Sequence, residues 1–199
     1  MKVPTMPWEK TFDTEDVIAR AITVFWSKGY EATSMADLTK AMGINKGSLY
    51  NAFGSKKKLF MRALQQYDHN RTQHTLNKMY AMEAPLNAIN GLFDHVINHN
   101  CSNPGNKGCL LVNTALELPH HDTDIQKMVT KSLDNIKDFF EQNIKRGQHD
   151  GSISVHINPQ TTAQVLRSLI VGVQVLSRGA SDPESFKLVK TQVLNTLRG

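Results

Sequence analysis

Cysteine and long apolar runs are scarce in this chain. Only two of its 199 residues are cysteine, Cys101 and Cys109, too few for a disulfide framework in a chain of this size. No apolar run is long enough to span a bilayer, and residues 1–16 turn acidic where a secretory signal continues with apolar residues. These absences argue against a disulfide-stapled secreted domain and a membrane-spanning protein, and we expect a cytoplasmic one.

Sequence signatures of common enzyme classes are also missing. The chain has no Gly-rich phosphate loop, no nucleophile elbow, no paired metal motif of suitable spacing, and no alternation of strand and helix patterns. We therefore expect no catalytic activity and no cofactor. What the chain does have is a modest basic excess, with 23 Lys and Arg against 18 Asp and Glu, a formal net charge of +5 and a pI of about 9.2. Such an excess suits an anionic partner.

Residues 34–43 carry the signals of a short helix with defined ends. Ser34 can cap the helix, while Asp37, three residues later, can reach back to the exposed amides in a capping-box pattern. Apolar residues recur at helical spacing up to Met42, and Gly43 can adopt the left-handed conformation that ends a helix. A helix is therefore predicted from Ser34 to Met42.

A second short helix is predicted directly after this one. Asn45 is its expected cap, and the helix runs over residues 46–53 with Leu49 and Phe53 on one inward face. The opposite face carries side chains that are short, polar or able to donate to phosphates and base edges: Lys46, Gly47, Ser48, Tyr50 and Asn51. Two short helices joined by a Gly-containing turn predict a helix-turn-helix element, whose second helix lies in a DNA major groove.

The charge around this element is of one sign. Between Leu38 and Tyr67 there is no Asp or Glu, and the basic residues there are Lys40, Lys46, Lys56, Lys57, Lys58 and Arg62. Such a patch attracts phosphates and makes binding strongly salt dependent. Ser55 is expected to cap the helix that begins at Lys56, so that helix amides and lysines face the same phosphate. The alternative is an ordinary solvated lysine face.

From about Asp13 to Leu64 the sequence resembles the N-terminal domain of the TetR (tetracycline repressor) family of transcriptional regulators. The matching positions are a first helix ending at Phe25 to Gly29, then Tyr30, Ala32-Thr33-Ser34-Met35, Asp37-Leu38, Ala41, Gly43-Ile44, Lys46-Gly47-Ser48-Leu49-Tyr50, Phe53, Ser55-Lys56 and Leu59. The resemblance implies that Tyr50 and Lys56 grip the DNA backbone. Two positions depart from the commoner pattern: Ala52 stands where a His is often found, and Lys57 replaces a frequent acidic residue.

We expect eight residues of this region to contact double-stranded DNA. Groove contacts are assigned to Lys46, Ser48 and Asn51, and phosphate contacts to Tyr50 and Lys56. Ser34 adds a contact to the DNA backbone from the start of its helix. The complete set is Ser34, Lys46, Gly47, Ser48, Tyr50, Asn51, Ser55 and Lys56.

The rest of the chain is helical by pattern. A first helix capped by Asp13 and a long helix from Ser55 to about Tyr80 are expected. Further helices are expected from Pro85, over 109–118, over a long segment ending near Gly147, over 161–178 and over 183–197, with a loop at 102–107. The predicted fold is all-α with about nine helices: a three-helix helix-turn-helix DNA-binding domain at 1–55, and a C-terminal effector-binding and dimerisation bundle at 56–199.

The last two predicted helices carry more apolar surface than the end of a chain usually needs for its own core. The resemblance implies a homodimer through a four-helix bundle of these helices, and a two-fold dimer also doubles the site that one short recognition helix reads, which makes the operator palindromic. The expected interface residues are Leu166, Leu169, Ile170, Val173, Phe186, Val189 and Val193. The alternative is that both helices simply close the core of the monomer.

Regulators of this family bind a small molecule in the C-terminal bundle, and the resemblance implies that such an effector releases the chain from DNA. Candidate contacts are Phe93, Cys109, Asn113, Glu117 and Phe140. Asn113 can instead bond to neighbouring backbone, and Glu117 can lie at a helix end in water. We expect a repressor, because repression is commoner among relatives. The residues themselves leave open the effector, the sign of regulation and a DNA-binding protein without ligand control.

Cys109 suggests a different input to the C-terminal domain. It follows Gly105 and Gly108 and stands beside Lys107, where a loop enters a helix. Amide dipoles and a nearby ammonium could lower the pKa of its thiol and make it a sensor of oxidants or electrophiles. The alternative is a small, buried, apolar side chain.

A metal site can also be drawn from this sequence. His95 and His99 are four residues apart on one helical face, and Cys101 follows closely. The same segment is equally typical of a solvated helix end, and we expect no metal. His120 and His121 are assigned to a polar connection before Asp122, which is expected to cap the next helix.

Overall fold

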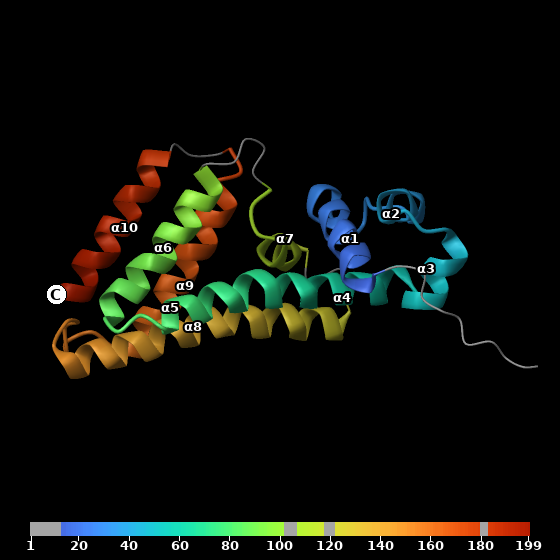
Figure 1. Ribbon diagram of the computed structural model, residues 1–199. Helices are drawn as coiled ribbons and strands as arrows, with labels where there is room; N and C mark the ends of the chain where they lie inside the picture. Colours follow the sequence, from blue (N-terminus) through green and yellow to red (C-terminus); the bar gives the residue numbers. More distant parts are fainter. Residues whose placement is uncertain (1–12, 102–106, 118–121, 180–182) are drawn as a thin grey trace, which may run out of the picture. The chain divides into compact units, whose positions relative to one another are not determined.

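The computed structural model describes residues 13–101, 107–117, 122–179 and 183–199 (Figure 1). Within these ranges the chain forms helices and connecting turns and no β-strand, which confirms the predicted all-α class. No helix in the same ranges is both long enough and apolar enough to cross a bilayer. The chain packs as two units, one ending at Gln66 and the other beginning at Tyr67.

The N-terminal unit contains α1 (Thr14–Lys28), α2 (Met35–Met42), α3 (Lys46–Phe53) and α4 (Lys56–Tyr67) up to Gln66. The helix ends follow the expected signals. Asp13 Oδ1 accepts a hydrogen bond from the N–H of Glu15 (2.9 Å), which makes Asp13 the predicted N-cap of α1.

An aromatic cluster explains why most of α4 belongs to this unit. The ring centroid of Phe60 on α4 lies 4.8 Å from those of Phe25 on α1 and Tyr30 after it, and Phe25 and Phe60 are buried. The expected domain boundary after residue 55 therefore differs from the packing, because residues 56–66 complete the core of the N-terminal unit.

The chain stays helical from Lys56 to Tyr80, as expected of the long helix. It passes from α4 through a π-helical segment, η1 (Asp68–Gln73), into α5 (His74–Tyr80). The π segment was not predicted, because the spacing of apolar residues does not distinguish a single π-helical turn from the α-helix on either side of it. If this run counts as one helix, the described ranges contain nine.

The C-terminal unit is built around α8 (Thr123–Asp150). Four helices pack on it: α5, α6 (Pro85–Cys101), α7 (Leu110–Leu116) and α9 (Pro159–Leu176). α10 (Pro183–Arg198) packs on α6 and α9 (Figure 1). The fully buried rings of Phe93, Phe139 and Phe140 lie in the apolar core between these helices.

α8 is longer than predicted. Gly147 lies inside the helix, which continues to Asp150 and ends where Gly151 takes the left-handed conformation, with φ of +79°. Gly147 is required for packing rather than for termination, because a Cβ there would lie 2.5 Å from the side chain of Ile153. The prediction of a helix end near Gly147 is therefore wrong by less than one turn.

The start of α8 agrees with its prediction. Asp122 Oδ1 accepts a hydrogen bond from the N–H of Ile125 (3.2 Å), so Asp122 is the N-cap. His120 and His121, and residues 102–106 of the predicted loop, lie outside the described residues.

Candidate nucleic-acid interface and ligand cavity

The end signals predicted for α2 and α3 are present. Ser34 Oγ accepts a hydrogen bond from the N–H of Asp37 (3.1 Å), and an Asp37 carboxylate oxygen accepts one from the N–H of Ser34 (3.0 Å), which completes the capping box. Gly43 has φ of +69°, and Asn45 Oδ1 accepts from the N–H of Ser48 (2.8 Å). These local contacts fix where α3 begins and therefore which side chains it exposes.

α3 has one buried and one accessible face. Leu49 and Phe53 are buried, as predicted. On the rest of the helix, Lys46, Gly47, Tyr50 and Asn51 are exposed, and Ser48 and Ala52 are half-buried. Tyr50 keeps 40% of its surface exposed, and Lys46 Nζ lies 6.0 Å from its ring centroid. The accessible face thus presents hydrogen-bonding groups and one aromatic ring to a partner.

The carboxylate of the capping box is paired within the N-terminal unit. Lys28 Nζ lies 2.6 Å from Asp37 Oδ1, and the hydroxyl of Ser34 donates to Asp37 Oδ2 (2.7 Å). The hydrogen bond from Lys28, followed by those from Ser34, holds the pKa of the Asp37 carboxyl well below its usual value. The carboxylate therefore stays ionised and locally compensated.

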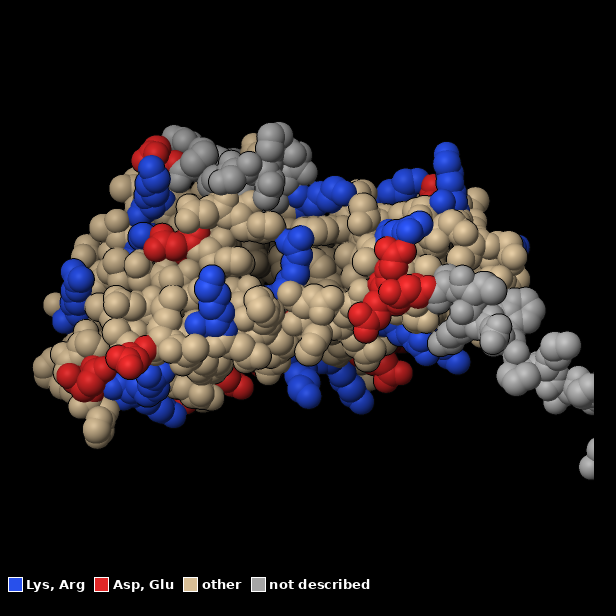
Figure 2. Space-filling view, in the orientation of Figure 1, with Lys and Arg blue, Asp and Glu red and all other residues tan. Residues whose placement is uncertain are grey.

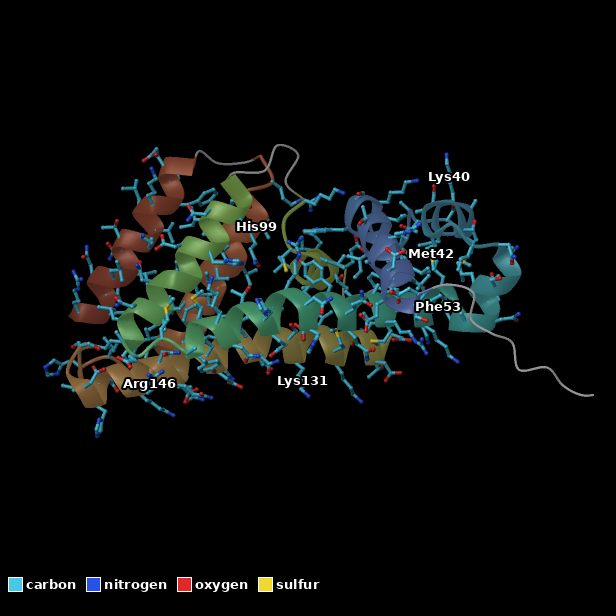
Figure 3. All side chains as sticks on the ribbon, viewed as in Figure 1. Lys40, Met42, Phe53, His99, Lys131 and Arg146 are labelled. Carbon is cyan, nitrogen blue, oxygen red and sulfur yellow. The ribbon has the colours of Figure 1, made fainter. Side chains whose placement is uncertain are left out.

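The first residues of α4 extend the basic surface. Lys56 Nζ lies 4.4 Å from the ring centroid of Tyr30 and 3.4 Å from the carbonyl oxygen of Glu31. Ser55 Oγ accepts a hydrogen bond from the N–H of Lys58 (3.1 Å), in the predicted capping role. Lys40 projects away from α2 (Figure 3).

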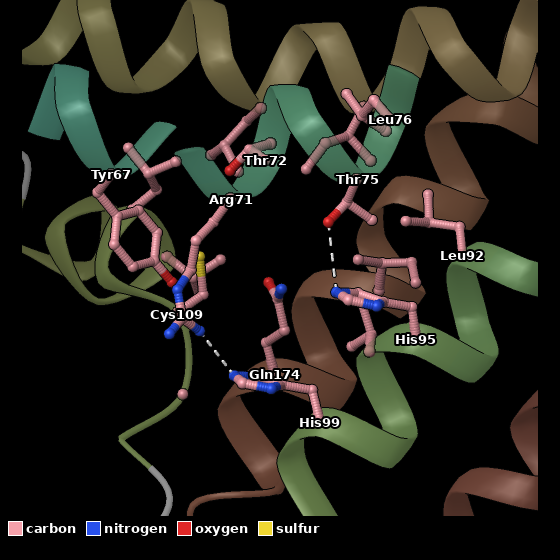
Figure 4. A pocket seen from close by; sticks show the side chains of 17 residues that line it. Tyr67, Arg71, Thr72, Thr75, Leu76, Leu92, His95, His99, Cys109 and Gln174 are labelled. Atoms are coloured by element: carbon pink, nitrogen blue, oxygen red, sulfur yellow. Dashed lines mark hydrogen bonds between the residues drawn. The ribbon is translucent and has the colours of Figure 1, made fainter. Parts of the chain in front are cut away.

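The C-terminal unit contains a cavity of about 80 Å³. Its walls come from the end of α4, from η1, α5, α6, α8 and α9, and from α7 with the two residues before it (Figure 4). The visible face in Figure 2 is hollowed between the places that α6 and α7 take in Figure 1. The apolar part of the wall consists of Leu76, Leu92, Val96, Leu111, Val112, Leu133, Ile136 and Ile170.

Polar side chains gather at one end of this cavity. Arg71 Nη1 donates a hydrogen bond to His99 Nε2 (2.9 Å), and Thr75 Oγ1 lies 3.3 Å from His95 Nε2 (Figure 4). The imidazole rings of His95 and His99 stack with centroids 6.1 Å apart. Arg71 and His95 are exposed and His99 is half-buried, so this end opens toward solvent.

The two imidazoles are held in their neutral form. Burial, followed by the charge of Arg71, lowers the pKa of His99. The partial burial of the ring is also the largest cause for His95, and the charges of His99, Lys78 and Arg71 lower the pKa of that imidazole further. A guanidinium has only donors, so His99 Nε2 accepts and the proton of the neutral ring is on Nδ1.

Two further groups complete the polar end. Gln174 Oε1 is buried and receives no hydrogen bond from the described residues. The Cys109 thiol lies within hydrogen-bonding reach of the Tyr67 hydroxyl, and both residues line the cavity. Burial raises the pKa of the Cys109 thiol despite hydrogen bonds from the backbone of Val112 and Leu111 and from Tyr67. This direction favours the alternative that the sequence left open, a small buried side chain, because desolvation outweighs the helix amides.

Only Cys109, of the five expected effector contacts, lines the cavity. Phe93 and Phe140 lie in the core with ring centroids 5.8 Å apart. Asn113 Nδ2 donates to the backbone oxygen of Lys107 (2.8 Å), the alternative that the sequence allowed. Glu117 forms the C-terminal cap position of α7.

Sequence reasoning missed the groups that give this cavity its polar end. The spacing of His95 and His99 placed them on one face of a helix, but it suggested a metal site and not the wall of a ligand cavity. Arg71 and Gln174 gave no signal, because they come from separate segments that only folding brings together. Among the described residues, no three His, Cys, Asp or Glu side chains converge as a metal site requires.

The residues expected at a dimer interface lie mostly inside the chain's own core. Buried there are Leu166, Ile170, Val173, Phe186 and Val193, while Leu169 and Val189 are partly buried against the same core. On the same two helices, the exposed large apolar side chains are Val165, Leu176 and Leu188. The expected residue set is corrected accordingly, because adjacent positions on a helix point about 100° apart.

Comparison with known proteins places this geometry in a family. Residues 17–63 match the family model described as bacterial regulatory proteins of the tetR family, and residues 85–193 match the tetracyclin repressor-like C-terminal domain. The chain belongs to the TetR family. It is therefore a DNA-binding transcriptional regulator, as the resemblance implied.

Relatives of this TetR-family chain include named repressors. The chain is 30% identical to YezE of Bacillus subtilis, an uncharacterized HTH-type transcriptional regulator, over 73% of this chain and 75% of YezE. It is 29% identical to the HTH-type transcriptional repressor ComR of Escherichia coli, over 86% of this chain and 83% of ComR.

A solved relative is a cysteine mutant of the TetR family regulator CifR in complex with a 26-base-pair double-stranded operator DNA. It superposes with a TM-score of 0.81 at 26% identity, covering 96% of this chain and 98% of the CifR chain.

Proposed function

We propose that this TetR-family protein is a cytoplasmic, homodimeric repressor without catalytic activity, which binds a palindromic operator and leaves it when a small molecule enters the C-terminal cavity. The observation that carries the DNA-binding part is the division of α3. Leu49 and Phe53 anchor the helix in the core, while the opposite face remains accessible. A helix held in this way can enter a major groove without unfolding its own domain.

The proposed DNA contacts follow the accessible face. Lys46, Ser48 and Asn51 read base edges, with Gly47 allowing close approach of the helix to the groove. Tyr50 and Lys56 bind phosphates; Lys56 starts from its position over Tyr30. The complete proposed set also includes Ser34 and Ser55, whose hydroxyls lie at the starts of α2 and α4.

The proposed dimer uses the outer face of α9 and α10. Val165, Leu169, Gly172 and Leu176 follow one another at helical spacing on α9. Val165 is 52% exposed and Leu188 on α10 is 72% exposed, and a Cβ at Gly172 would meet nothing within 4 Å. A second copy of the chain can cover this strip and form a four-helix bundle.

The proposed release mechanism uses the continuous helical run from Lys56 to Tyr80. Its first part begins beside α3 in sequence and carries Lys56, while its later part supplies Arg71, Thr75 and Leu76 to the cavity. A ligand that prefers one conformation of this run changes the population of DNA-binding dimers.

Binding selection from random duplexes tests this function. Recovery of a palindrome with two half-sites is expected, since each α3 of a two-fold dimer reads one half. Gel shifts with the recovered duplex, repeated with candidate metabolites, should then show release. An enzyme would give no specific shift, and an architectural DNA-binding protein would shift without responding to any ligand.

A further inference from the structure

We propose that the C-terminal cavity selects a small aliphatic carboxylate, with the carboxylate at the Arg71 guanidinium, beside His99, and the tail between the apolar walls. This inference rests on the proposed function, because it names the chemical class of the effector. It deepens that function by distinguishing an anionic ligand from the neutral and cationic compounds that an apolar cavity alone would accept.

The charge of the cavity wall selects an anion. Arg71 carries the one permanent charge among the lining residues, and no Asp or Glu is among them. Asp68, on the same π-helical segment, does not line the cavity. Its charge acts on the Cys109 thiol, but its carboxylate accepts hydrogen bonds from the hydroxyl of Ser132 and from Gln73 Nε2. A guanidinium binds a carboxylate through two parallel N–H donors, which gives both affinity and orientation.

The hydrogen bond between Arg71 and His99 prepares this end for an anion. His99 Nε2 accepts a hydrogen bond from Arg71 Nη1 over 2.9 Å. This contact fixes the orientation of the guanidinium, whose remaining N–H groups can donate to an anion. The exposure of Arg71 and His95 leaves the anion partly solvated, so that a charged group need not lose all of its water on binding.

The inner part of the cavity limits the tail. Leu76, Leu92, Leu111, Ile136 and Ile170 are all buried side chains, and they offer only apolar surface. The volume of about 80 Å³ holds about six water-sized groups. A chain of about four to six carbon atoms fits this space.

Gln174 adds a preference within the class of carboxylates. Its Oε1 is buried without a donor from the described residues, and Figure 4 shows its side chain between Cys109 and His95. A hydroxyl next to the carboxylate of the ligand can donate to this oxygen. Satisfying a buried acceptor in this way should improve affinity by about two- to tenfold.

Calorimetric titration of the full-length chain with hexanoate, hexanamide and 2-hydroxyhexanoate tests the inference. Hexanoate should bind at least about tenfold more tightly than hexanamide, because only the carboxylate pairs with the guanidinium. 2-Hydroxyhexanoate should bind more tightly than hexanoate. Equal binding of hexanoate and hexanamide, or no binding of any carboxylate, would overturn the proposal.

Variants identify the groups responsible. Arg71→Met should lower hexanoate affinity about tenfold or more, whereas Arg198→Met, at an exposed position at the end of α10, should leave it unchanged. Gln174→Leu should abolish the preference for the 2-hydroxy acid while hexanoate still binds. Circular dichroism of each variant distinguishes a lost contact from a lost fold.

The duplex selection keeps this inference separate from the proposed function. A chain that recovers a palindromic operator but binds none of the carboxylates retains its function as a regulator and refutes only the ligand class. A chain that binds carboxylates but no specific duplex refutes the proposed function and leaves the anion site standing.

Discussion

Arg71 donates a hydrogen bond to His99 across 2.9 Å and thereby joins η1 to α6 at the open end of the cavity. The contact couples the protonation of an imidazole to the position of a guanidinium, because a protonated His99 could no longer accept through Nε2. Protonation would also place two positive charges side by side. The conformation of this end of the cavity therefore depends on pH.

Acidification should destabilise the C-terminal unit through His95 and His99. Their pKa values are lowered on folding, so at pH values below the usual 6.5 the unfolded chain binds more protons than the folded one. Stability is then present above that pH and is lost as the pH falls toward the lowered pKa. The charged groups that act on these two rings are Arg71 on both and Lys78 on His95, and His99 also acts on His95. The other titratable groups of the cavity wall are Tyr67 and Cys109.

Thermal unfolding at pH 7.5 and 5.5 measures this effect. The decrease in Tm should be smaller in the His95→Gln/His99→Gln double variant than in the parent chain. His149→Gln, at the exposed end of α8, is the matched control and should retain the full decrease. An equal decrease in all three proteins would contradict the assignment.

Two substitutions should weaken DNA binding in different ways. Lys56→Ala should lower affinity for all duplexes alike and reduce the slope of log K against log salt by about 1. Asn51→Ala should cost about 1–3 kcal/mol only at particular base pairs. Lys145→Ala on α8 is the control and should change neither the affinity nor the specificity. Full binding and specificity in both Lys56→Ala and Asn51→Ala would refute the docking mode.

Removing the cap of α3 should destabilise it. Asn45→Ala deletes the acceptor of the Ser48 N–H and should cost about 1 kcal/mol in the free energy of unfolding. Amide exchange at Ser48 should become faster, as hydrogen exchange can measure. Asn45→Asp keeps an acceptor and should restore slow exchange; fast exchange in Asn45→Asp as well would mean that the cap is not the cause.

A charge on the outer face of α9 should prevent dimer formation. Val165→Glu puts a carboxylate into the proposed apolar interface, where its desolvation is unfavourable. Light scattering at micromolar concentration should report a monomer for Val165→Glu and a dimer for Val155→Glu, whose side chain is 69% exposed in the turn before α9. A dimeric Val165→Glu would move the interface elsewhere.

The Cys109 thiol should react slowly with electrophiles. Its pKa is raised by burial, so little thiolate is present near neutral pH. In a Cys101→Ser background, iodoacetamide should alkylate Cys109 about tenfold more slowly than a free thiol at pH 7.5. Rapid alkylation, together with loss of DNA binding, would instead support the sensor hypothesis from the sequence.

The features that the sequence predicted correctly are local ones. The caps at Asp13, Ser34, Asn45 and Asp122 could be predicted because a side chain and the amide it caps are two or three residues apart. Amphipathic spacing likewise predicted the helices and the inward face of α3. Both kinds of signal require only the chain within one or two turns.

The features that the sequence did not predict depend on distant segments. Leu166 and Val165 are both apolar neighbours on α9, yet one is buried and the other exposed, since the position of α8 and α6 decides which side is the core. The polar end of the cavity needs Arg71, His99 and Gln174 from three elements, and no periodicity within one of them indicates the others.

The π-helical segment at Asp68–Gln73 decides which way the side chains of α5 point around the helix axis. If this stretch were wound as an ordinary α-helix, one residue fewer would fill the turn, and Thr75 and Leu76 would swing about 100° around the axis. The two would then face away from the imidazoles and the aliphatic lining. A rewinding of six residues could therefore dismantle the binding cavity while leaving every helix on either side intact.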